Sequence, residues 1–572
     1  MLDLVIDHAT VVDGTGAPAR VASVGVRDGR IVIIADHIDE DAGERIDATG
    51  SVLCPGFIDP HTHYDAQLAW DPAASPSNLH GVTTVIAGNC GFTLAPLAPG
   101  DADYLRRMMA KVEGMPLAAL EEGVDWSWES YGDFLARFEG RLGVNAAFMV
   151  GHCALRRRVM GTAAVGNEAT PEQLDEMVAM LHEAIEAGGL GFSTTLARTH
   201  SDGDGQPVAS RWATTEELLA LARATGEHPG TQLEFASDGC LDGFPPEEVE
   251  FMIDFASAAG RPLNWNVLTV DSHDPARYRN QLDAMDRCRD AGAHVVALTM
   301  PVLVGMNMSF LNYCALNMLP DWGPILGLTP VARLACLRDP DVRRFLLERA
   351  ASPDAGVFAR LTGWERYVIG DTYADESLRG ARIGDIAADR GVSPFDALLD
   401  VVVADDLRTV LWPGPTDDDD ESWKLRAEAW EHPSVMIGGS DAGAHLDRMC
   451  GAPYTTQWLA DCLRGKQLTT LERAVQHMTQ RPAALFGLSD RGLIAEGNRA
   501  DLVLFDPTTV DTGPVELRHD LPGGTPRLVA ESVGVRRVWV SGTATVVDGA
   551  ATGALPGEVL RSGRDTQTVT FS

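Results

Sequence analysis

The sequence predicts an α/β fold, in which a TIM-like (β/α)8 barrel is joined to a small β-sandwich domain formed from both chain termini. Three observations lead to this fold class. Eight short apolar runs alternate with helical patterns through the middle of the chain, and both ends carry alternating strand patterns. No glycine-rich phosphate loop follows the first run, which favours the barrel over a doubly wound open sheet.

The two ends of the chain have the same alternating pattern of apolar and polar residues. Residues 2–54 alternate apolar and polar positions, and Asp-Gly pairs at 13–14 and 28–29 indicate tight hairpin turns. The segments ADLVLFDP (500–507) and VRRVWVSGTATVVDG (535–549) continue this pattern near the other end. We therefore assign residues 1–54 and 487–572 to one small β domain and residues 55–486 to the barrel.

The middle of the chain repeats a strand followed by a helix. The apolar runs are VLCPGFID, TTVIAGN, AAFMVGH, GLGFSTT, TQLEFAS, PLNWNVLTV, HVVALTMP and SVMIGGSD. The helical segments TPEQLDEMVAMLHEAIEAGG and TTEELLALARATGEH each begin with Thr and carry Gln or Glu three residues later, which predicts capping boxes. A long insertion over about 302–432 separates the seventh and eighth runs and is typical of a lid or a subunit contact. A homo-oligomer is therefore one expectation.

Composition narrows the class of partner. The formal net charge of −36 disfavours nucleic acid and an anionic membrane, since both require a basic face. The N-terminus MLDLVIDHATVVDG has no basic region of the kind that begins a signal peptide, and no apolar run approaches the length of a membrane helix. Nine scattered cysteines indicate a reduced, cytoplasmic protein. We expect a small-molecule substrate.

The segment GFIDPHTHYD places two histidines at the end of the first apolar run. His61 and His63 share one face of an extended chain, because side chains repeat every two residues. Two imidazoles on one face can reach the same divalent cation. The alternative is a pair of core or surface histidines, but their position at a strand end, followed by Asp65, favours a metal.

Three other run ends carry reactive side chains. Cys90, in GNCGF, is either a thiolate ligand or a small buried hydrophobe. Asp441, in GGSDAGAH, can bind a metal and accept a proton, although an N-cap is the alternative. His152, in VGHC, is expected beside the reaction centre as a catalytic neighbour, or else as a hydrogen-bonded core histidine.

These motifs resemble those of the amidohydrolase superfamily, and within it the N-acyl-D-amino-acid deacylase (D-aminoacylase) family. The resemblance rests on PGFIDPHTHYD, GVTTVIAGNCGF, VGHCALRRRVMG, GFSTT, IGGSDAGAH and GLIAEGNRADLVLFDP. It implies a metal-bearing barrel that hydrolyses an amide-type C–N bond, usually with zinc. It also implies that His61, His63 and Asp441 are metal ligands, that Asp441 is the general base and later the acid, and that Cys90 is a thiolate ligand.

Two departures from the family concern the metal. The family ends its fifth and sixth strands with a histidine each, whereas this chain has Glu234 and Asn266 at those places. We therefore expect one principal metal ion at His61, His63 and Asp441, assisted by Cys90 or Glu234. A carboxylate at the end of a buried strand is costly unless it is paired or bound to a cation, which favours Glu234 as a ligand.

A further departure concerns the substrate. The family places a lysine after the sixth-strand histidine for the substrate carboxylate, and this chain has Leu268 there. Arg448 stands close to the family's arginine without matching its local pattern. The predicted substrate contacts are Arg198, His200, Asn266 and Arg448.

The sequence thus predicts a metal-dependent hydrolase of an amide-type C–N bond that resembles N-acyl-D-amino-acid deacylases. Two different functions stay open beside it. One is an amidohydrolase that acts on a cyclic amide, an ester or another bond. The second is a catalytically inactive barrel that serves as a binding protein, which the changed residues at the fifth and sixth strands would permit.

Overall fold

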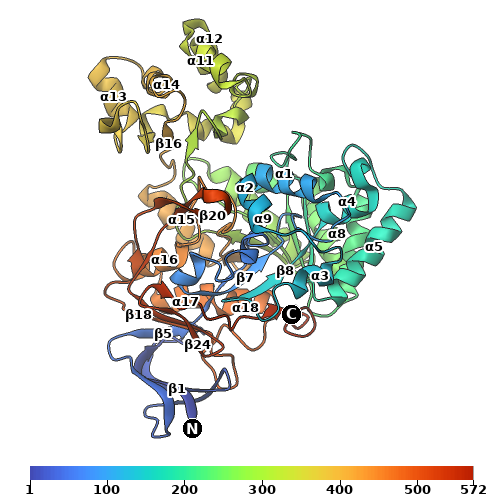
Figure 1. The fold of residues 1–572 in the computed structure, drawn as a ribbon, viewed down its shortest axis with the longest axis vertical. Helices are drawn as coiled ribbons and strands as arrows, with labels where there is room; N and C mark the ends of the chain where they lie inside the picture. The colour runs from blue at the N-terminus through green and yellow to red at the C-terminus, as the bar shows by residue number, and fades with distance from the viewer. Residues whose placement is uncertain (571–572) are drawn as a thin grey trace. The chain divides into compact units, whose positions relative to one another are not determined.

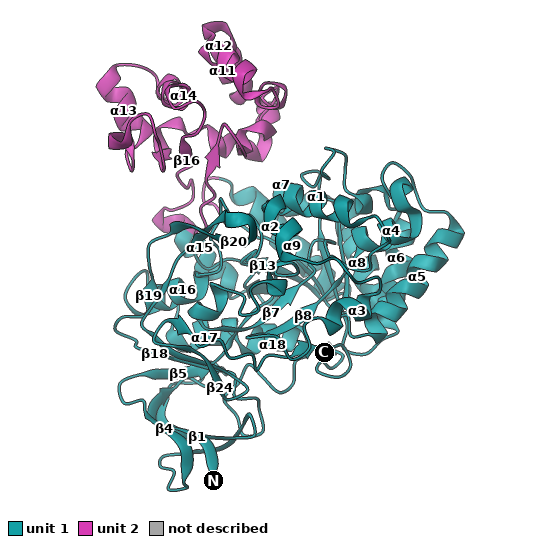
Figure 2. Cartoon of the chain, in the orientation of Figure 1, with its two compact units in different colours: residues 1–270, 274–302, 423–572 teal, residues 271–273, 303–422 magenta. Residues whose placement is uncertain are grey.

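The computed structural model describes residues 1–570 and divides into two compact units (Figure 2). Unit 1 contains Met1–Val270, Asp274–Val302 and the chain from Trp423 onward. Unit 2 contains Leu303–Ser422, within the part of the sequence where an insertion is predicted, and also Asp271–His273, which precede that part. None of the described helices is both long and apolar enough to cross a membrane.

Parallel strands form the centre of unit 1. Each of the eight predicted apolar runs contains one, and the third contains two short ones. They are β6 (Phe57–Asp59), β7 (Val82–Ala87), β8 (Asn145–Phe148), β9 (Val150–Gly151), β10 (Gly191–Thr195), β11 (Gln232–Ala236), β12 (Leu263–Trp265), β13 (Val295–Thr299) and β17 (Val435–Ile437). The side chains of these strands are buried on both faces, as in parallel strands that helices cover.

These strands follow one another in sequence order. One ladder runs β17-β13-β12-β11-β10-β9 and a second runs β8-β7-β6, with β26 (Val559–Leu560) at its edge. Only Met149 separates β8 from β9, so the ladders are continuous there. At the other edge Thr62 pairs with Ala442 in a parallel bridge, which brings the segments after β6 and β17 together. This is the strand order expected of a (β/α)8 barrel.

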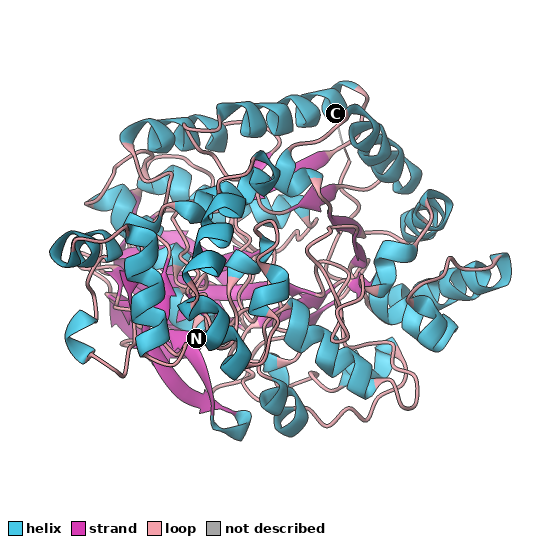
Figure 3. Cartoon of the chain, turned by 90° about the horizontal axis from the view of Figure 1, so that it is seen from above, coloured by secondary structure: helices cyan, strands magenta, loops and turns pink. Residues whose placement is uncertain are grey.

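Helices lie around these strands (Figure 3). The helices that follow the strands of unit 1 are α4 (His152–Met160), α5 (Pro171–Glu186), α6 (Thr215–Gly226), α8 (Pro246–Ala259), α9 (Pro275–Asp290), α16 (Tyr454–Leu463), α17 (Leu471–Met478) and α18 (Gln480–Leu485). Shorter ones are α1 (Ala102–Val112), α2 (Leu117–Gly123), α3 (Tyr131–Ala136) and α7 (Gly239–Asp242), and α15 (Asp420–Trp430) leads back from unit 2.

The two predicted capping boxes have different outcomes. In α5 the Thr170 side chain accepts from the Gln173 amide and Gln173 accepts from the Thr170 amide, so this box is confirmed. In α6 Thr214 accepts from the amide of Glu217, but the reciprocal bond is absent from the described cap. The Glu217 carboxylate instead accepts from His152 and Arg156, so the second prediction is only half right.

The two ends of the chain form one nine-stranded sheet, whose strands lie side by side in Figure 1. Its strands are β1 (Leu2–Val11), β2 (Arg20–Arg27), β3 (Arg30–Ala35), β4 (Ala42–Asp47), β5 (Val52–Pro55), β18 (Leu502–Phe505), β23 (Val535–Val540), β24 (Thr543–Val547) and β25 (Ala550–Ala551). The N-terminal strand β5 pairs with the C-terminal strand β18, which joins the termini. A second layer that would make this sheet a sandwich stays a prediction.

The two Asp-Gly pairs in this sheet differ from each other in the turns that they form. Asp28 and Gly29 have positive φ angles and connect β2 to β3 directly, as a two-residue hairpin requires. The expected tight turn at 13–14 is wrong, because residues 12–19 form a longer loop between β1 and β2. Asp13 accepts from the amide and hydroxyl of Thr15 and so holds a local turn inside that loop.

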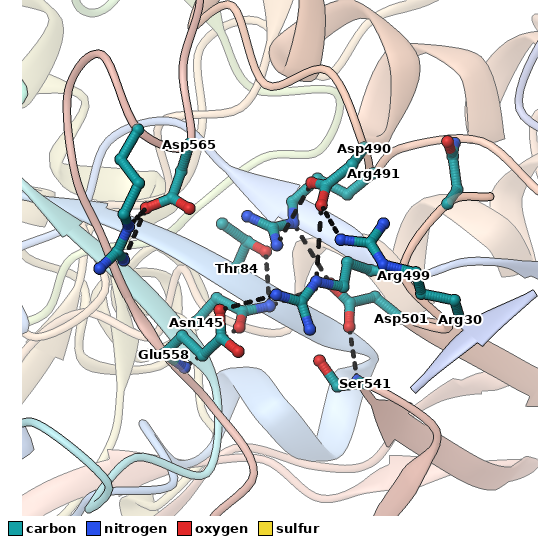
Figure 4. A network of polar contacts seen from close by, with 12 residues as sticks. Arg30, Thr84, Asn145, Asp490, Arg491, Arg499, Asp501, Ser541, Glu558 and Asp565 are labelled. Carbon is teal, nitrogen blue, oxygen red and sulfur yellow. Dashed lines mark hydrogen bonds and ion pairs between the residues drawn. The ribbon is translucent and has the colours of Figure 1, made fainter. Parts of the chain in front are cut away.

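A buried polar network joins the terminal sheet to the parallel strands (Figure 4). The Asp501 carboxylate accepts from Asn145 Nδ2 of β8 at 2.9 Å and from the Ser541 amide at 2.7 Å. Arg491 Nε lies 3.5 Å from the same carboxylate, and both of these side chains are nearly inaccessible to solvent. The ion pair is thus shielded from water, and the hydrogen bond from Asn145 links Asp501, which directly precedes β18, to β8.

Short strands also pair in the C-terminal part of unit 1. They are β19 (Asp511–Thr512) with β22 (Ser532–Val533) and β20 (Glu516–Leu521) with β21 (Thr525–Val529).

Unit 2 has a core of its own. Its strands β14 (Met308–Ser309), β15 (Val368–Ile369) and β16 (Val410–Trp412) are antiparallel, and its helices are α10 (Gly323–Leu326), α11 (Pro330–Arg338), α12 (Pro340–Ala350), α13 (Ile383–Arg390) and α14 (Pro394–Ala404). Trp322, Trp364 and Phe395 pack their rings together at its centre. This separate apolar cluster explains why the insertion forms a compact body.

Candidate active site

A cavity of about 110 Å³ lies where the parallel strands of unit 1 end. It is lined by His63, Cys90, Val112, Glu113, Ala197, Thr199, His200, Ala236, Ser237, Cys240, Leu241, Asn266, Asp441 and His445. Cys90 follows β7, Asn266 follows β12 and Asp441 follows β17, so the carboxyl ends of distant strands supply the polar side chains. Active sites of parallel barrels lie at this end.

Four predicted metal ligands form a continuous row of donor atoms. Cys90 Sγ lies 3.6 Å from His61 Nε2, and His61 Nε2 lies 3.4 Å from Asp441 Oδ1. The same Asp441 oxygen lies 3.2 Å from His63 Nε2. The ligand atoms of His61, His63 and Cys90 all lie within 4.8 Å of one another. The structure therefore brings together all four side chains.

The distances between neighbouring donors in this row are those of metal ligands. Two ligand atoms on a tetrahedral zinc ion, at bond lengths of about 2.0–2.3 Å, lie roughly 3.3–3.6 Å apart. The neighbouring donors here are separated by 3.2 to 3.6 Å. Imidazole, thiolate and carboxylate are also the ligand types that zinc takes in proteins. His61, His63 and Cys90 thus have both the chemistry and the close grouping of a metal site, and Asp441 adjoins the two histidines.

The Cys90 turn is held by hydrogen bonds from its backbone. Cys90 itself has φ 53°, an unusual conformation for a residue with a side chain, and its amide donates to Glu234 Oε2 at 2.7 Å. The next amide, of Gly91, donates to Ser193 Oγ at 3.1 Å. Gly91 packs so closely on Thr194 that an added Cβ would lie 3.0 Å from the Thr194 Cα. These contacts aim the sulfur at His61.

Glu234 was expected to bind the metal, and the structure gives it a backbone contact. One carboxylate oxygen accepts from Cys90, while Oε1 is buried without a hydrogen-bond partner among the described residues. Glu234 and Asp441 are both outside the cluster of His61, His63 and Cys90, but Asp441 forms ion pairs with the two histidines, whereas the described residues give Glu234 none. Burial raises the pKa of Glu234 to about 8, despite the Cys90 amide. Its role as a ligand stays a prediction.

The electrostatics of the row set the charge of each donor. Burial opposes ionisation of Asp441, but hydrogen bonds to His61 and His63 hold its pKa well below the usual value. Burial also disfavours a charged His63, yet Glu113 and Asp441 raise its pKa to about 10. Burial and Glu234 raise the pKa of the Cys90 thiol far above its ordinary value. No Lys or Arg is among the described residues that line the cavity, and the ion pairs given for Asp441 and Glu113 are with histidines.

Two predicted substrate contacts lie in the cavity. His200 Nδ1 is hydrogen-bonded to Thr195 Oγ1 at 2.7 Å, and its ring packs edge-on against Phe92. Burial lowers the pKa of His200 to about 3, so it is neutral. Asn266 Oδ1 lies 4.0 Å from Cys90 Sγ and faces the same space.

The two predicted arginines are held elsewhere. Arg198 forms an ion pair with Asp242 and does not line the cavity, and its side chain is 37% exposed. Arg448 Nε donates to Asp447 at 2.7 Å and is likewise not among the lining residues. The structure therefore does not bring either guanidinium into the cavity.

His152 is also placed outside the cavity. Its Nδ1 lies 2.9 Å from Thr194 Oγ1 and its Nε2 lies 2.8 Å from Glu217 Oε1. Arg156 donates to the same Glu217 carboxylate. Both ring nitrogens are thus engaged in a buried network, so the structure supports a hydrogen-bonded core histidine rather than one in contact with reacting atoms.

Sequence reasoning missed Glu113 as a candidate. Glu113 follows α1, lines the cavity and places Oε2 3.6 Å from His63 Nε2. Its backbone carbonyl accepts a hydrogen bond from the amide of His445, whose ring also lines the cavity. KVEGMP follows a helix rather than a strand, so no strand-end rule pointed to it.

Comparisons with known proteins show the family of the chain. A model of the amidohydrolase family matches residues 44–546. D-aminoacylase of Alcaligenes xylosoxydans xylosoxydans is 30% identical over 98% of this chain and 97% of that protein. A crystal structure of D-aminoacylase superposes with a TM-score of 0.65 at 28% identity, covering 98% of this chain and all of that one.

A second solved structure bears on the metal. N-acyl-D-glutamate deacylase from Bordetella bronchiseptica has a TM-score of 0.65 and 26% identity to this chain, covering 98% of it and all of that chain. That protein is complexed with zinc and with a phosphonate inhibitor that mimics the tetrahedral intermediate of its reaction. With the family model matched over most of its length, the chain belongs to the amidohydrolase family and is a hydrolase of amide-type C–N bonds.

Proposed function

We propose that this enzyme removes the acyl group from N-acyl-D-amino-acid-like substrates, using one principal divalent ion, zinc, at the cavity. The row of donors from Cys90 through His61 and Asp441 to His63 carries this proposal, because its neighbouring donors have the spacing of metal ligands and three of them form a close cluster. The names of the relatives, D-aminoacylase and N-acyl-D-glutamate deacylase, support the substrate class. We also infer that the parallel strands form a (β/α)8 barrel.

A divalent ion supplies Lewis acidity, which polarises the scissile carbonyl and lowers the pKa of a bound water toward neutrality. His61, His63, Cys90 and Asp441 would hold it. A cation also offsets the buried negative charge of the site and favours the thiolate form of Cys90. With the cation bound, Cys90 can therefore act as a thiolate ligand, which its raised pKa would otherwise prevent.

Asp441 is the residue that moves the proton. Its pKa lies below the usual range, so it is ionised at neutral pH and can accept a proton. Its side chain is 26% exposed, while His61 and His63 are at most 1% exposed, so water and substrate reach Asp441 most easily. Asp441 takes a proton from the attacking water and later donates it to the leaving nitrogen.

A second candidate activity is hydrolysis of a neutral or cyclic amide. The described residues lining the cavity include no Lys or Arg, and Arg198 and Arg448 pair with aspartates outside it. A substrate without a free carboxylate would need no such partner. This arrangement favours an uncharged amide, such as a cyclic one, as the second candidate substrate.

The cellular setting is inferred from the cysteines. All nine are free in the structure, and five of the six that are buried lie away from the cavity's donor row. Unpaired cysteines are usual in a reducing compartment. We propose a cytoplasmic enzyme with a small-molecule substrate.

The experiment is a substrate panel with metal-loaded protein. N-acyl-D-amino acids, N-acyl-L-amino acids, hydantoins and lactones are assayed before and after removal of metal with a chelator. Turnover of N-acyl-D-amino acids that is lost with the metal and restored by zinc supports the main proposal. Turnover of hydantoins alone supports the second candidate, and turnover of lactones alone contradicts amide hydrolysis.

A further inference from the structure

We propose that Glu113, at the end of α1, is an additional ligand of the metal centre and extends the donor row beyond His63. This inference rests on the proposed function, because it requires that the site binds a divalent ion. Glu113 does not follow any of the parallel strands. The ligand set would therefore combine strand ends with a segment that approaches from the side of the cavity.

Two carboxylates face one nitrogen at this end of the row. His63 Nε2 lies 3.2 Å from Asp441 Oδ1 and 3.6 Å from Glu113 Oε2. One ring nitrogen carries at most one proton, so it can donate a hydrogen bond to only one of the two carboxylates at a time. A divalent cation bound by His63 and both carboxylates would offset the charge of the two acids together.

The Glu113 carboxylate has little other compensation. The residue is 3% exposed, and within the described chain His63 is the only ion-pair partner that the structure gives it. It lines the cavity without a hydrogen bond to any described side chain. A buried carboxylate in this situation is costly unless it is paired or coordinates a metal. Its distance from His63 also equals the distance from Cys90 Sγ to His61 Nε2 at the other end of the row.

The backbone holds Glu113 in place. Its amide donates to Met109 at the end of α1, and its carbonyl accepts from His445 in the loop that carries Asp441. The next residue, Gly114, has φ +57°, and an added Cβ would lie 3.0 Å from the His445 ring. The loop after β17 thus fixes both carboxylates, Asp441 directly and Glu113 through His445.

Metal affinity tests the inference without relying on turnover. The full-length protein is stripped of metal with a chelator and titrated with Co²⁺, whose visible absorption reports ligand type and geometry. Zinc affinity is then measured by competition with a chromophoric chelator. The proteins are the wild type, Glu113→Gln, which keeps the side-chain shape, and Glu121→Gln, an exposed control on neighbouring α2. Circular dichroism checks that each is folded.

We expect Glu113→Gln to weaken metal binding by about tenfold or more and to change the cobalt spectrum, while Glu121→Gln matches the wild type. Wild-type affinity and spectrum in folded Glu113→Gln would overturn the inference and leave Glu113 as an ion-pair partner of His63. Should that variant not fold, Glu113→Asp decides: an unaltered affinity and spectrum contradict ligation, and weaker binding supports it. If the wild type itself binds no metal, the proposed function fails as well.

Discussion

The backbone amide of Cys90 donates a hydrogen bond to the Glu234 carboxylate across 2.7 Å. This bond crosses from the loop after β7 to β11 and stabilises a turn in which Cys90 has φ 53°. Glu234 therefore positions the sulfur, although the resemblance led us to expect a metal-binding histidine at this place. Whether it also touches the ion can be decided by comparing two substitutions.

Glu234→Gln retains an oxygen that can accept from Cys90, whereas Glu234→Ala leaves that buried amide unsatisfied. We expect Glu234→Ala to lower the free energy of unfolding by about 1–3 kcal/mol or more, and Glu234→Gln to cost much less. Chemical denaturation and metal content measure both effects. If Glu234→Gln loses as much bound metal as Glu234→Ala, the carboxylate is itself a ligand and the positioning role is insufficient.

Asp441→Asn removes the proton acceptor and keeps the shape of the side chain. Because Asp441 is ionised and reachable from the cavity, we expect kcat to fall by about 10²–10⁴-fold at saturating metal. Circular dichroism should remain that of the wild type. Steady-state kinetics measure the loss, and undiminished turnover in a metal-loaded variant would contradict the assignment of Asp441 as general base.

Removal of metal should make stability depend on pH. Burial raises the pKa of Glu234 to about 8 and that of Glu113 to about 7, from an ordinary value of 4.5 for each. Between about pH 4.5 and these raised pKa values, the native protein therefore binds more protons than the unfolded chain. The favourable contribution is complete below about pH 4.5 and is lost as pH rises through the native pKa, by about 1.4 kcal/mol per pH unit for each proton.

We therefore expect these two carboxyls to lower the free energy of unfolding of metal-free protein as pH rises from about 6.5 to 8, above the range in which buried neutral histidines such as His200 have the opposite effect, and saturating zinc to reduce that fall by supplying positive charge. Urea titrations at several pH values, with and without metal, measure it. A metal-free protein whose stability rises over this range would show that these carboxyls are compensated in another way.

Arg198→Ala tests the substrate contacts. Arg198 pairs with Asp242 at a 37% exposed site outside the cavity lining, so its loss should leave KM and kcat at wild-type values. His200→Ala is the matched comparison, since His200 lines the cavity, and it should raise KM. A clear rise in KM for Arg198→Ala would show that this arginine contacts the substrate. Its loop would then have to move toward the cavity when substrate binds.

The strand-end rule explains how much of the site could be predicted from sequence. His61, His63, Cys90 and Asp441 each follow a short apolar run, and parallel strands bring such positions to one place. His152 obeys the same rule but begins α4, where its ring faces Glu217 on α6. The sequence pattern shows where a strand ends but not toward which neighbour the side chain turns.

Other features depend on contacts distant in sequence. To predict Glu113, one would have to know that the end of α1 contacts the loop after β17. The His445 amide makes this contact. The ion pair of Arg198 likewise depends on Asp242, which lies beyond the next strand. In the fold, strand patterns predicted both the pairing of the two termini and the parallel strands. The tight turn predicted at residues 13–14 was wrong, because residues 12–19 form a longer loop.

The most direct test of the central claim is anomalous X-ray scattering from crystals of zinc-loaded protein, combined with metal analysis of the same sample. We expect a peak in the cavity at bonding distance from His61, His63, Asp441 and Cys90, with about one equivalent of tightly bound zinc. Absence of metal after reconstitution, or an ion bound away from the two histidines, would contradict it.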